Sequence, residues 1–116
     1  MRYLIALVIA LGMVGCVSVE APNSDSNRDW KNYGYAWASK GYIEQDERDL
    51  FKLTSGNSKE LIHAYRQGYA EGKQQYCQQD PFVLGYNGKI YYGICNDLDP
   101  RYLDEYWRGK KRRNRR

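Results

Sequence analysis

Residues 57–77 read NSKELIHAYRQGYAEGKQQYC, and this stretch combines a helix start, a helical face and a helix end. Asn57-Ser58-Lys59-Glu60 has the form of a capping box, in which a short polar side chain caps the first turn and a glutamate returns a bond to it. One helical face of apolar and small residues follows: Leu61, Tyr65, Gly68, Tyr69, Gly72 and Tyr76. Gln78-Gln79-Asp80-Pro81 closes the pattern, because proline disfavours helix at the residue before it. The stretch predicts a long helix that ends near Cys77.

The preceding segment predicts a second helix of the same kind. Ser26-Asn27-Arg28-Asp29 is a capping box with aspartate in place of glutamate. One face then carries Trp30, Tyr33, Gly34, Trp37, Ala38 and Gly41, and Gly41 suits a helix end. Gly34-Tyr35-Ala36 recurs as Gly68-Tyr69-Ala70. Because small residues let two backbones approach closely, we expect these helices to pack face to face, with aromatic rings filling the flanks.

Two shorter segments also carry helical patterns. Residues 44–53 have an ambiguous pattern, and a short helix there would be lined by Ile43, Leu50, Phe51 and Leu53. Asp99-Pro100 predicts the start of a last helix, with aspartate as the N-cap and proline in the first position. The apolar side of this last helix is Tyr102, Leu103, Tyr106 and Trp107, and Gly109 is its expected end.

The clearest strand pattern lies between the long helix and the last one. Phe82–Tyr86 and Lys89–Cys95 flank Asn87-Gly88, a dipeptide typical of the two-residue type I′ hairpin turn. A lone hairpin is marginal in water, so it would need helices and a covalent tie to hold it. The predicted fold class is therefore α+β, with three to four helices packed around one antiparallel β-hairpin that a disulfide ties to the long helix.

The N-terminus has the features of a targeting segment. Arg2 precedes an unbroken apolar run, Tyr3–Leu11, which is shorter than the roughly 20 residues of a membrane span and fits a signal-peptide core. Gly15-Cys16, with Met13 where leucine is usual, resembles the lipobox of bacterial lipoproteins. The resemblance implies cleavage before Cys16, diacylglycerol on its thiol and an acyl group on its new amine. Val17, where aspartate would favour retention in the inner membrane, implies transfer to the outer membrane, facing the periplasm. The alternative is an ordinary secretory peptide with a chance cysteine.

We expect four parts along the chain: a signal peptide over residues 1–15, the lipidated Cys16 and a flexible tether over 16–25, an α+β domain over 26–109, and a basic tail over 110–116. The tether shows no helical period and contains Pro22. The tail holds six of the 18 basic residues: Lys110, Lys111, Arg112, Arg113, Arg115 and Arg116. The positive net charge therefore belongs to the tail and not to the domain.

The three cysteines fit one lipid site and one pair. If Cys16 carries lipid, Cys77 and Cys95 remain, and an oxidising compartment permits a disulfide between them. Such a bond would stabilise a small domain by roughly 3 kcal/mol in the chain-entropy model. Two free buried thiols are the alternative, and a zinc site is a weaker one, because only His63 could join the two cysteines. No cofactor is expected beyond the covalent lipid.

Three patterns together are similar to a known family. They are Tyr65-x-x-Gly68-x-x-x-Gly72-x-x-x-Tyr76-Cys77, then Phe82-x-x-Gly85-x-x-Gly88-x-x-Tyr91-x-Gly93-x-Cys95, and finally Tyr106-x-x-Gly109. They resemble the long helix, the hairpin and the closing element of small bacterial lipoproteins with the domain of unknown function 2799. The resemblance implies lipoprotein character and a Cys77–Cys95 bond. It implies no activity, because that family has none assigned.

Few residues suggest catalysis. His63 is the only histidine, and it lies off the apolar stripe of its helix, so we expect it to face solvent. Without another imidazole, a Ser-His or Cys-His pair would have to use His63. The chain has no nucleophile elbow, phosphate-binding loop or metalloprotease motif. The acidic residues Glu44, Asp46, Glu47 and Asp49 are most simply a solvated face. An envelope hydrolase is therefore only a minor alternative.

Two features favour binding. Twelve tyrosines and three tryptophans are either core or a stacking platform for sugar rings. The basic tail is either a solvated end or an attachment to an anionic polymer or membrane. The sequence predicts a non-enzymatic, outer-membrane-anchored interaction or structural module, with a glycan- or peptidoglycan-binding module as the alternative. Expected partners are the membrane through the lipid anchor, and peptidoglycan, anionic lipid or another envelope protein. Nucleic acid is not expected.

Overall fold

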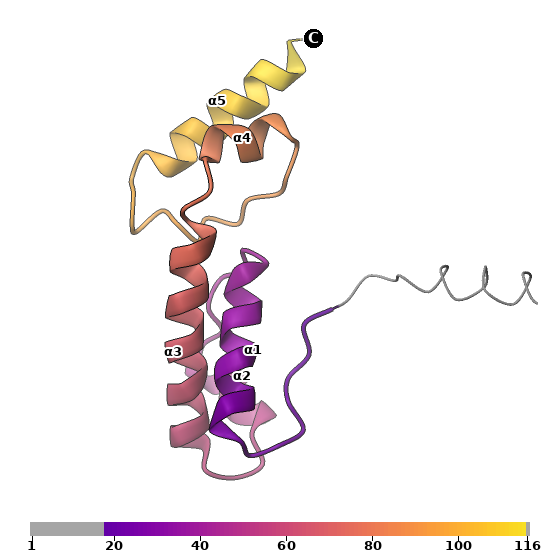
Figure 1. Ribbon diagram of the computed structural model, residues 1–116, viewed down its shortest axis with the longest axis vertical. Coiled ribbons are helices and arrows are strands. Elements are labelled where there is room, and N and C mark those ends of the chain that lie inside the picture. The colour runs from indigo at the N-terminus through magenta and orange to yellow at the C-terminus, as the bar shows by residue number, and fades with distance from the viewer. Residues whose placement is uncertain (1–17, 116) are drawn as a thin grey trace, which may run out of the picture.

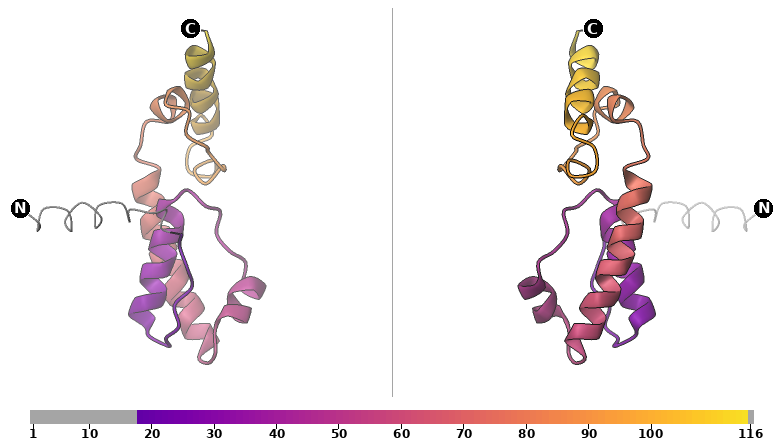
Figure 2. Two further views of the ribbon diagram at one scale, coloured as in Figure 1. Left: turned by 90° about the vertical axis from the view of Figure 1, so that its right-hand side faces the viewer. Right: turned by 90° about the vertical axis from the view of Figure 1, so that its left-hand side faces the viewer.

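The computed structural model describes residues 18–115, and over this range the chain is helical, with no β-strand (Figure 1). The helices are α1 Asn27–Ser39, α2 Glu47–Leu53, α3 Ser58–Tyr76, α4 Pro81–Tyr86 and α5 Tyr102–Asn114. Figure 2 shows two helix pairs placed end to end, α1 with α3 and α4 with α5, while α2 stands to one side. The predicted signal peptide and Cys16 lie outside the described residues.

The predicted β-hairpin is wrong, and the described part of the chain is all-α rather than α+β. The first predicted strand is helix α4. Its start is fixed by Asp80, whose carboxylate accepts a hydrogen bond from the Phe82 N–H at 2.9 Å. Pro81 stands in the first turn, where no N–H partner is needed. The second predicted strand, residues 89–95, consists of irregular backbone and turns.

The asparagine–glycine dipeptide ends a helix instead of turning a hairpin. A type I′ turn needs positive φ at both residues, but φ is −79° at Asn87 and 72° at Gly88. The Gly88 N–H donates to the Gly85 carbonyl at 3.0 Å, and the Lys89 N–H donates to the Leu84 carbonyl at 3.0 Å. This pair of bonds is the Schellman helix end, in which a left-handed glycine is usual.

Packing against α5 explains why residues 81–86 form a helix and not a strand. A Cβ on Gly85 would overlap the Tyr106 carbonyl oxygen, and a Cβ on Gly109 would overlap the Phe82 carbonyl oxygen. Each glycine thus lies directly against the backbone of the other helix, a distance at which weak Cα–H···O contacts also form. Leu84 and Tyr106 are buried beside this crossing. A strand over residues 82–86 would lose these contacts.

The predicted face-to-face packing of the first two long helices is confirmed. Gly34 lies against the Tyr65 carbonyl, and Gly68 lies against the Lys31 carbonyl. α1 and α3 run in the same direction, because α2 and its flanking segments carry the chain back between them (Figure 1). The rings that flank the crossing are buried: Trp30, Tyr33, Tyr65 and Tyr69.

Both helix pairs are built on the same crossing. In each pair, a glycine lies against the carbonyl three residues before the partner glycine and against the N–H one residue after it. The partner glycines are Gly34 and Gly68 in the first pair, and Gly85 and Gly109 in the second. The glycine repeat noted in the sequence therefore marks a packing device that the chain uses twice.

The two pairs are joined through the segment that follows α4. Within residues 18–115, the helix backbones of one pair do not approach those of the other. Cys77, at the end of α3, is bonded to Cys95 with the Cα atoms 5.7 Å apart, which confirms the predicted disulfide. Next to it, the Lys73 ammonium pairs with the Asp97 carboxylate at 2.7 Å. Loop contacts and one covalent bond therefore hold the second pair to the first.

Several helix ends differ from the prediction. Ser26 caps α1 as expected, with its Oγ accepting from the Asp29 N–H at 3.4 Å. Asn57 precedes α3 in a left-handed conformation and makes no side-chain cap bond. Residues 47–53 form the short helix α2, but of the four apolar residues expected to line it only Leu50 is buried. α5 runs through Gly109 to Asn114 instead of ending at the glycine.

Part of the segment predicted as a tether lies against the helical body. Val19 and Ala21 pack against the core, and the Trp30 indole N–H donates to the Ser24 carbonyl at 2.8 Å. These contacts place residues 19–24 along the first helix pair. Over the described range, none of the helices has the length and apolar character that crossing a membrane requires.

Candidate functional site

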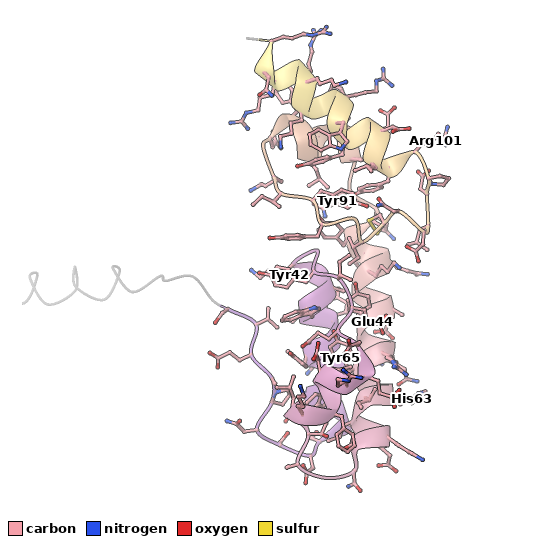
Figure 3. The ribbon with its side chains drawn as sticks, turned by 180° about the vertical axis from the view of Figure 1, so that it is seen from behind. Tyr42, Glu44, His63, Tyr65, Tyr91 and Arg101 are labelled. Atoms are coloured by element: carbon pink, nitrogen blue, oxygen red, sulfur yellow. A yellow bond between two sulfur atoms is a disulfide. The ribbon has the colours of Figure 1, made fainter. Side chains whose placement is uncertain are left out.

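The basic tail belongs to helix α5 and is not a separate segment. Lys110 to Asn114 form the last helical residues, and Arg115 is the C-cap. Cations in this position interact favourably with the negative end of the helix dipole. Figure 3 shows nitrogen-tipped side chains spreading from this end of the molecule, far from the labelled His63. Arg116 lies outside the described residues.

Three tail cations join Arg108 around a pocket. Arg108, Lys111, Arg112 and Arg115 follow one another at steps of three, one and three residues, which places them on one face of α5. Together with Phe82 of α4 they line an open pocket of about 370 Å³. The only carboxylate that pairs with one of these cations in the described chain is Glu105, whose Oε1 lies 2.6 Å from Arg108 Nη1.

Two other tail cations have structural contacts. The Lys110 ammonium lies 4.9 Å from the centre of the Trp107 ring, within cation–π range. Arg113 Nη1 donates to the Tyr86 carbonyl at 3.4 Å, at the end of α4. The tail residues predicted to bind an anionic surface therefore divide into a pocket-lining set, a lysine that contacts a ring of its own helix, and Arg113, which joins α5 to the end of α4.

Six aromatic rings of the described residues are buried in the core. Trp30 and Tyr65 are 1% and 0% exposed, and Tyr33, Tyr69, Tyr102 and Tyr106 are also buried. A partly exposed row of rings remains where the two helix pairs meet, near the labelled Tyr42 in Figure 3. In this row, the centre of the Tyr42 ring lies 4.8 Å from that of Trp37 and 5.6 Å from that of Tyr92.

His63 is exposed, as predicted. It lines an open pocket of about 310 Å³ with Asn27, Arg28, Lys31, Glu60, Ala64 and Gln67. These neighbours include no Ser, Thr or Cys, so the pocket places no hydroxyl or thiol nucleophile beside His63. Nor do the described residues bring together three or more His, Cys, Asp or Glu side chains that could hold a metal ion.

The acidic residues of the α2 region lie in solvent, as expected for a solvated face. Glu44 and Glu47 each approach the Arg66 guanidinium, at 3.8 and 4.0 Å. The three side chains are between two fifths and three quarters exposed, so these ion pairs contribute little to stability.

Comparison with known proteins adds one finding. A family model described as a protein of unknown function, DUF2799, matches residues 29–111. The chain belongs to the DUF2799 family. No curated protein and no solved structure gives a significant match.

The residues that carry the DUF2799 resemblance have structural roles. Gly68, Gly85 and Gly109 lie at the two helix crossings, and Cys77 and Cys95 form the disulfide. The pattern therefore specifies how the helix pairs are built, and it includes no reactive group. Two residues of the cationic pocket, Arg112 and Arg115, lie beyond the family match, which ends at residue 111.

Two members of this pocket, Arg108 and Phe82, are not among the binding residues that the sequence predicts. The spacing from Arg108 to Arg115 was available as a signal, but treating Gly109 as a helix end separated Arg108 from the tail. Phe82 was assigned to a strand, and its position next to α5 follows only from the second helix crossing.

The buried tyrosines predict a sharp loss of stability at high pH. Burial raises the pKa of Tyr69 and Tyr102 far above the ordinary value, and it also raises the pKa of Tyr65, Tyr76 and Tyr91. A raised folded-state pKa stabilises the fold fully below the unfolded value of about 10, and this contribution is lost as pH rises beyond it.

An alkaline titration followed by phenolate absorbance and circular dichroism tests this expectation. We expect these five tyrosines to ionise together with helix loss, as one cooperative transition above pH 10. All phenols titrating near their ordinary pKa while the helix signal persists would contradict the buried positions.

Proposed function

We propose that this DUF2799 protein is a bacterial lipoprotein, anchored through lipid on Cys16 to the outer membrane with its helical body in the periplasm. The body acts as a non-enzymatic interaction module. Support for a non-enzymatic role comes from the exposed His63, whose pocket places no hydroxyl or thiol beside it, and from family residues that serve packing.

The observation that carries the proposal is the Cys77–Cys95 disulfide. It uses two of the three cysteines and leaves Cys16, which directly follows Gly15 and an apolar signal-type run, as the candidate for lipid. Structural disulfides persist in oxidising compartments such as the periplasm. Each buried lipid CH₂ contributes about 0.8 kcal/mol, so more than one acyl chain on Cys16 gives a stable anchor.

Metabolic labelling with a fatty acid tests the anchor. We expect the wild-type protein to carry the label and Cys16→Ser to lose it completely, with the precursor retaining its leader. The matched control is Cys77→Ser/Cys95→Ser, which removes two other cysteines and should keep the label. Unlabelled wild-type protein would rule out the lipoprotein.

A glycan-binding module is the second candidate, and the row Trp37–Tyr42–Tyr92 favours it. Tyr92 is 50% exposed, so its ring is accessible for stacking on a sugar. A pull-down on purified peptidoglycan should show retention that Tyr92→Ala reduces and that removal of residues 110–116 weakens further. Tyr35→Ala is the control, since Tyr35 is 41% exposed but lies outside the row. Retention at the level of an unrelated protein would exclude this candidate.

A further inference from the structure

We propose that the α5 face formed by Arg108, Lys111, Arg112 and Arg115, together with Phe82, binds the phosphate headgroup of an anionic phospholipid. The inference rests on the proposed lipid anchor, which would hold the body beside a membrane. It assigns a site and a ligand chemistry to a face that the family pattern does not explain.

The concentration of charge on this face points to an anionic ligand. Like charges three and four residues apart on a helix repel one another. Among the described residues, no carboxylate pairs with Lys111, Arg112 or Arg115, and all three are exposed. The helix dipole accounts for cations near the C-terminus in general. It does not account for their sharing one face with Arg108, while Lys110 and Arg113 contact Trp107 and Tyr86.

The pocket chemistry favours phosphate. Guanidinium groups present planar forks of N–H donors that match two phosphate oxygens at once, and an ammonium adds a compact positive charge. Three arginines and one lysine along one side of about 370 Å³ of open space offer several N–H donors to one headgroup. Four of the five pocket residues lie on the last two turns and the C-cap of α5, and Figure 1 places this helix at the end of the molecule that carries the C-terminus.

Phe82 favours a lipid over a free phosphate ion. Its ring is half-buried and lies nearly parallel to that of Tyr86, at 13° with the centres 6.4 Å apart. An apolar wall next to four cations fits an amphiphile, in which glycerol and hydrocarbon adjoin the phosphate. A free phosphate ion would contact the cations alone and would not use the apolar wall.

Native mass spectrometry of the full chain, purified in neutral detergent, tests the site. The protein is offered equal amounts of phosphatidylglycerol and phosphatidylcholine, and the retained lipids are counted from the mass. We expect phosphatidylglycerol to be preferred, and Lys111→Gln/Arg112→Gln to weaken its binding about 30-fold. That factor corresponds to roughly 1 kcal/mol for each cation near an anionic surface. Circular dichroism of the variant checks that these exposed substitutions leave the helices intact.

Lys89→Gln/Arg101→Gln is the matched control, because it removes the same charge from exposed residues outside the pocket. It should keep the preference for phosphatidylglycerol. Equal retention of both lipids, or equal losses in the two double variants, would overturn the site. Inorganic pyrophosphate, added as a separate arm, would overturn the lipid assignment if it bound to the pocket while phosphatidylglycerol did not. The same spectra report whether Cys16 carries lipid, so failure of the anchor and failure of the site are distinguishable.

Discussion

Gly68→Ala should destabilise the body by about 3 kcal/mol, although alanine is the better helix former. The new Cβ would overlap the Lys31 carbonyl oxygen and lie 3.0 Å from the Tyr35 nitrogen. These are backbone atoms of α1, so no side chain can rotate away, and the two helices must separate. Overpacking of this kind typically costs about 1–3 kcal/mol, and backbone contact places the cost at the upper end.

Urea unfolding followed by circular dichroism measures this effect. Gly56→Ala is the matched control, because a Cβ at Gly56 meets nothing within 4 Å. That variant should stay within about 1 kcal/mol of the wild type. Equal stability of the Gly68 and Gly56 variants would show that α1 and α3 do not cross at Gly34 and Gly68.

Removal of the disulfide is expected to have the second large effect. Cys77 and Cys95 are 18 residues apart, for which the chain-entropy model gives roughly 3 kcal/mol. Among the described residues, the helix backbones of the two pairs do not approach each other. The loss of stability should therefore fall mainly on the second pair, α4 and α5. Cys77→Ala/Cys95→Ala should therefore unfold at lower urea concentration and exchange the amide hydrogens of α4 and α5 faster than those of α3.

A reductant supplies the control for this variant. It should lower the stability of the wild type to that of the double variant and leave the double variant unchanged. If the reductant has no effect on the wild type, the two cysteines do not form the bond that joins the helix pairs.

The sequence predicts the first helix pair because its information is local and periodic. Gly34 and Gly68 lie on helical faces among aromatic residues, and small residues on such faces allow close backbone approach. The disulfide could also be predicted, since removing Cys16 from the count leaves one pair. Both conclusions follow from residue types whose physical roles have few alternatives.

The second pair could not be predicted in the same way. Asn87-Gly88 serves equally well in a hairpin turn and at a helix end, and only six residues separate Asp80 from Asn87, too few for a helical period to show. The choice between hairpin and helix is decided by the crossing of α4 and α5 at Gly85 and Gly109, which are far apart in the chain. The cationic pocket was missed for the same reason, because it depends on α5 continuing through that glycine.

The central claim, a lipid-bearing Cys16 on a disulfide-joined helical body, is tested most directly by the intact mass of the mature protein extracted from its membrane fraction. The claim predicts loss of the first 15 residues, added mass from three acyl chains and their glycerol, and a deficit of two hydrogens that a reductant restores. A mass equal to the full unmodified chain, with three thiols free before any reductant is added, would contradict it.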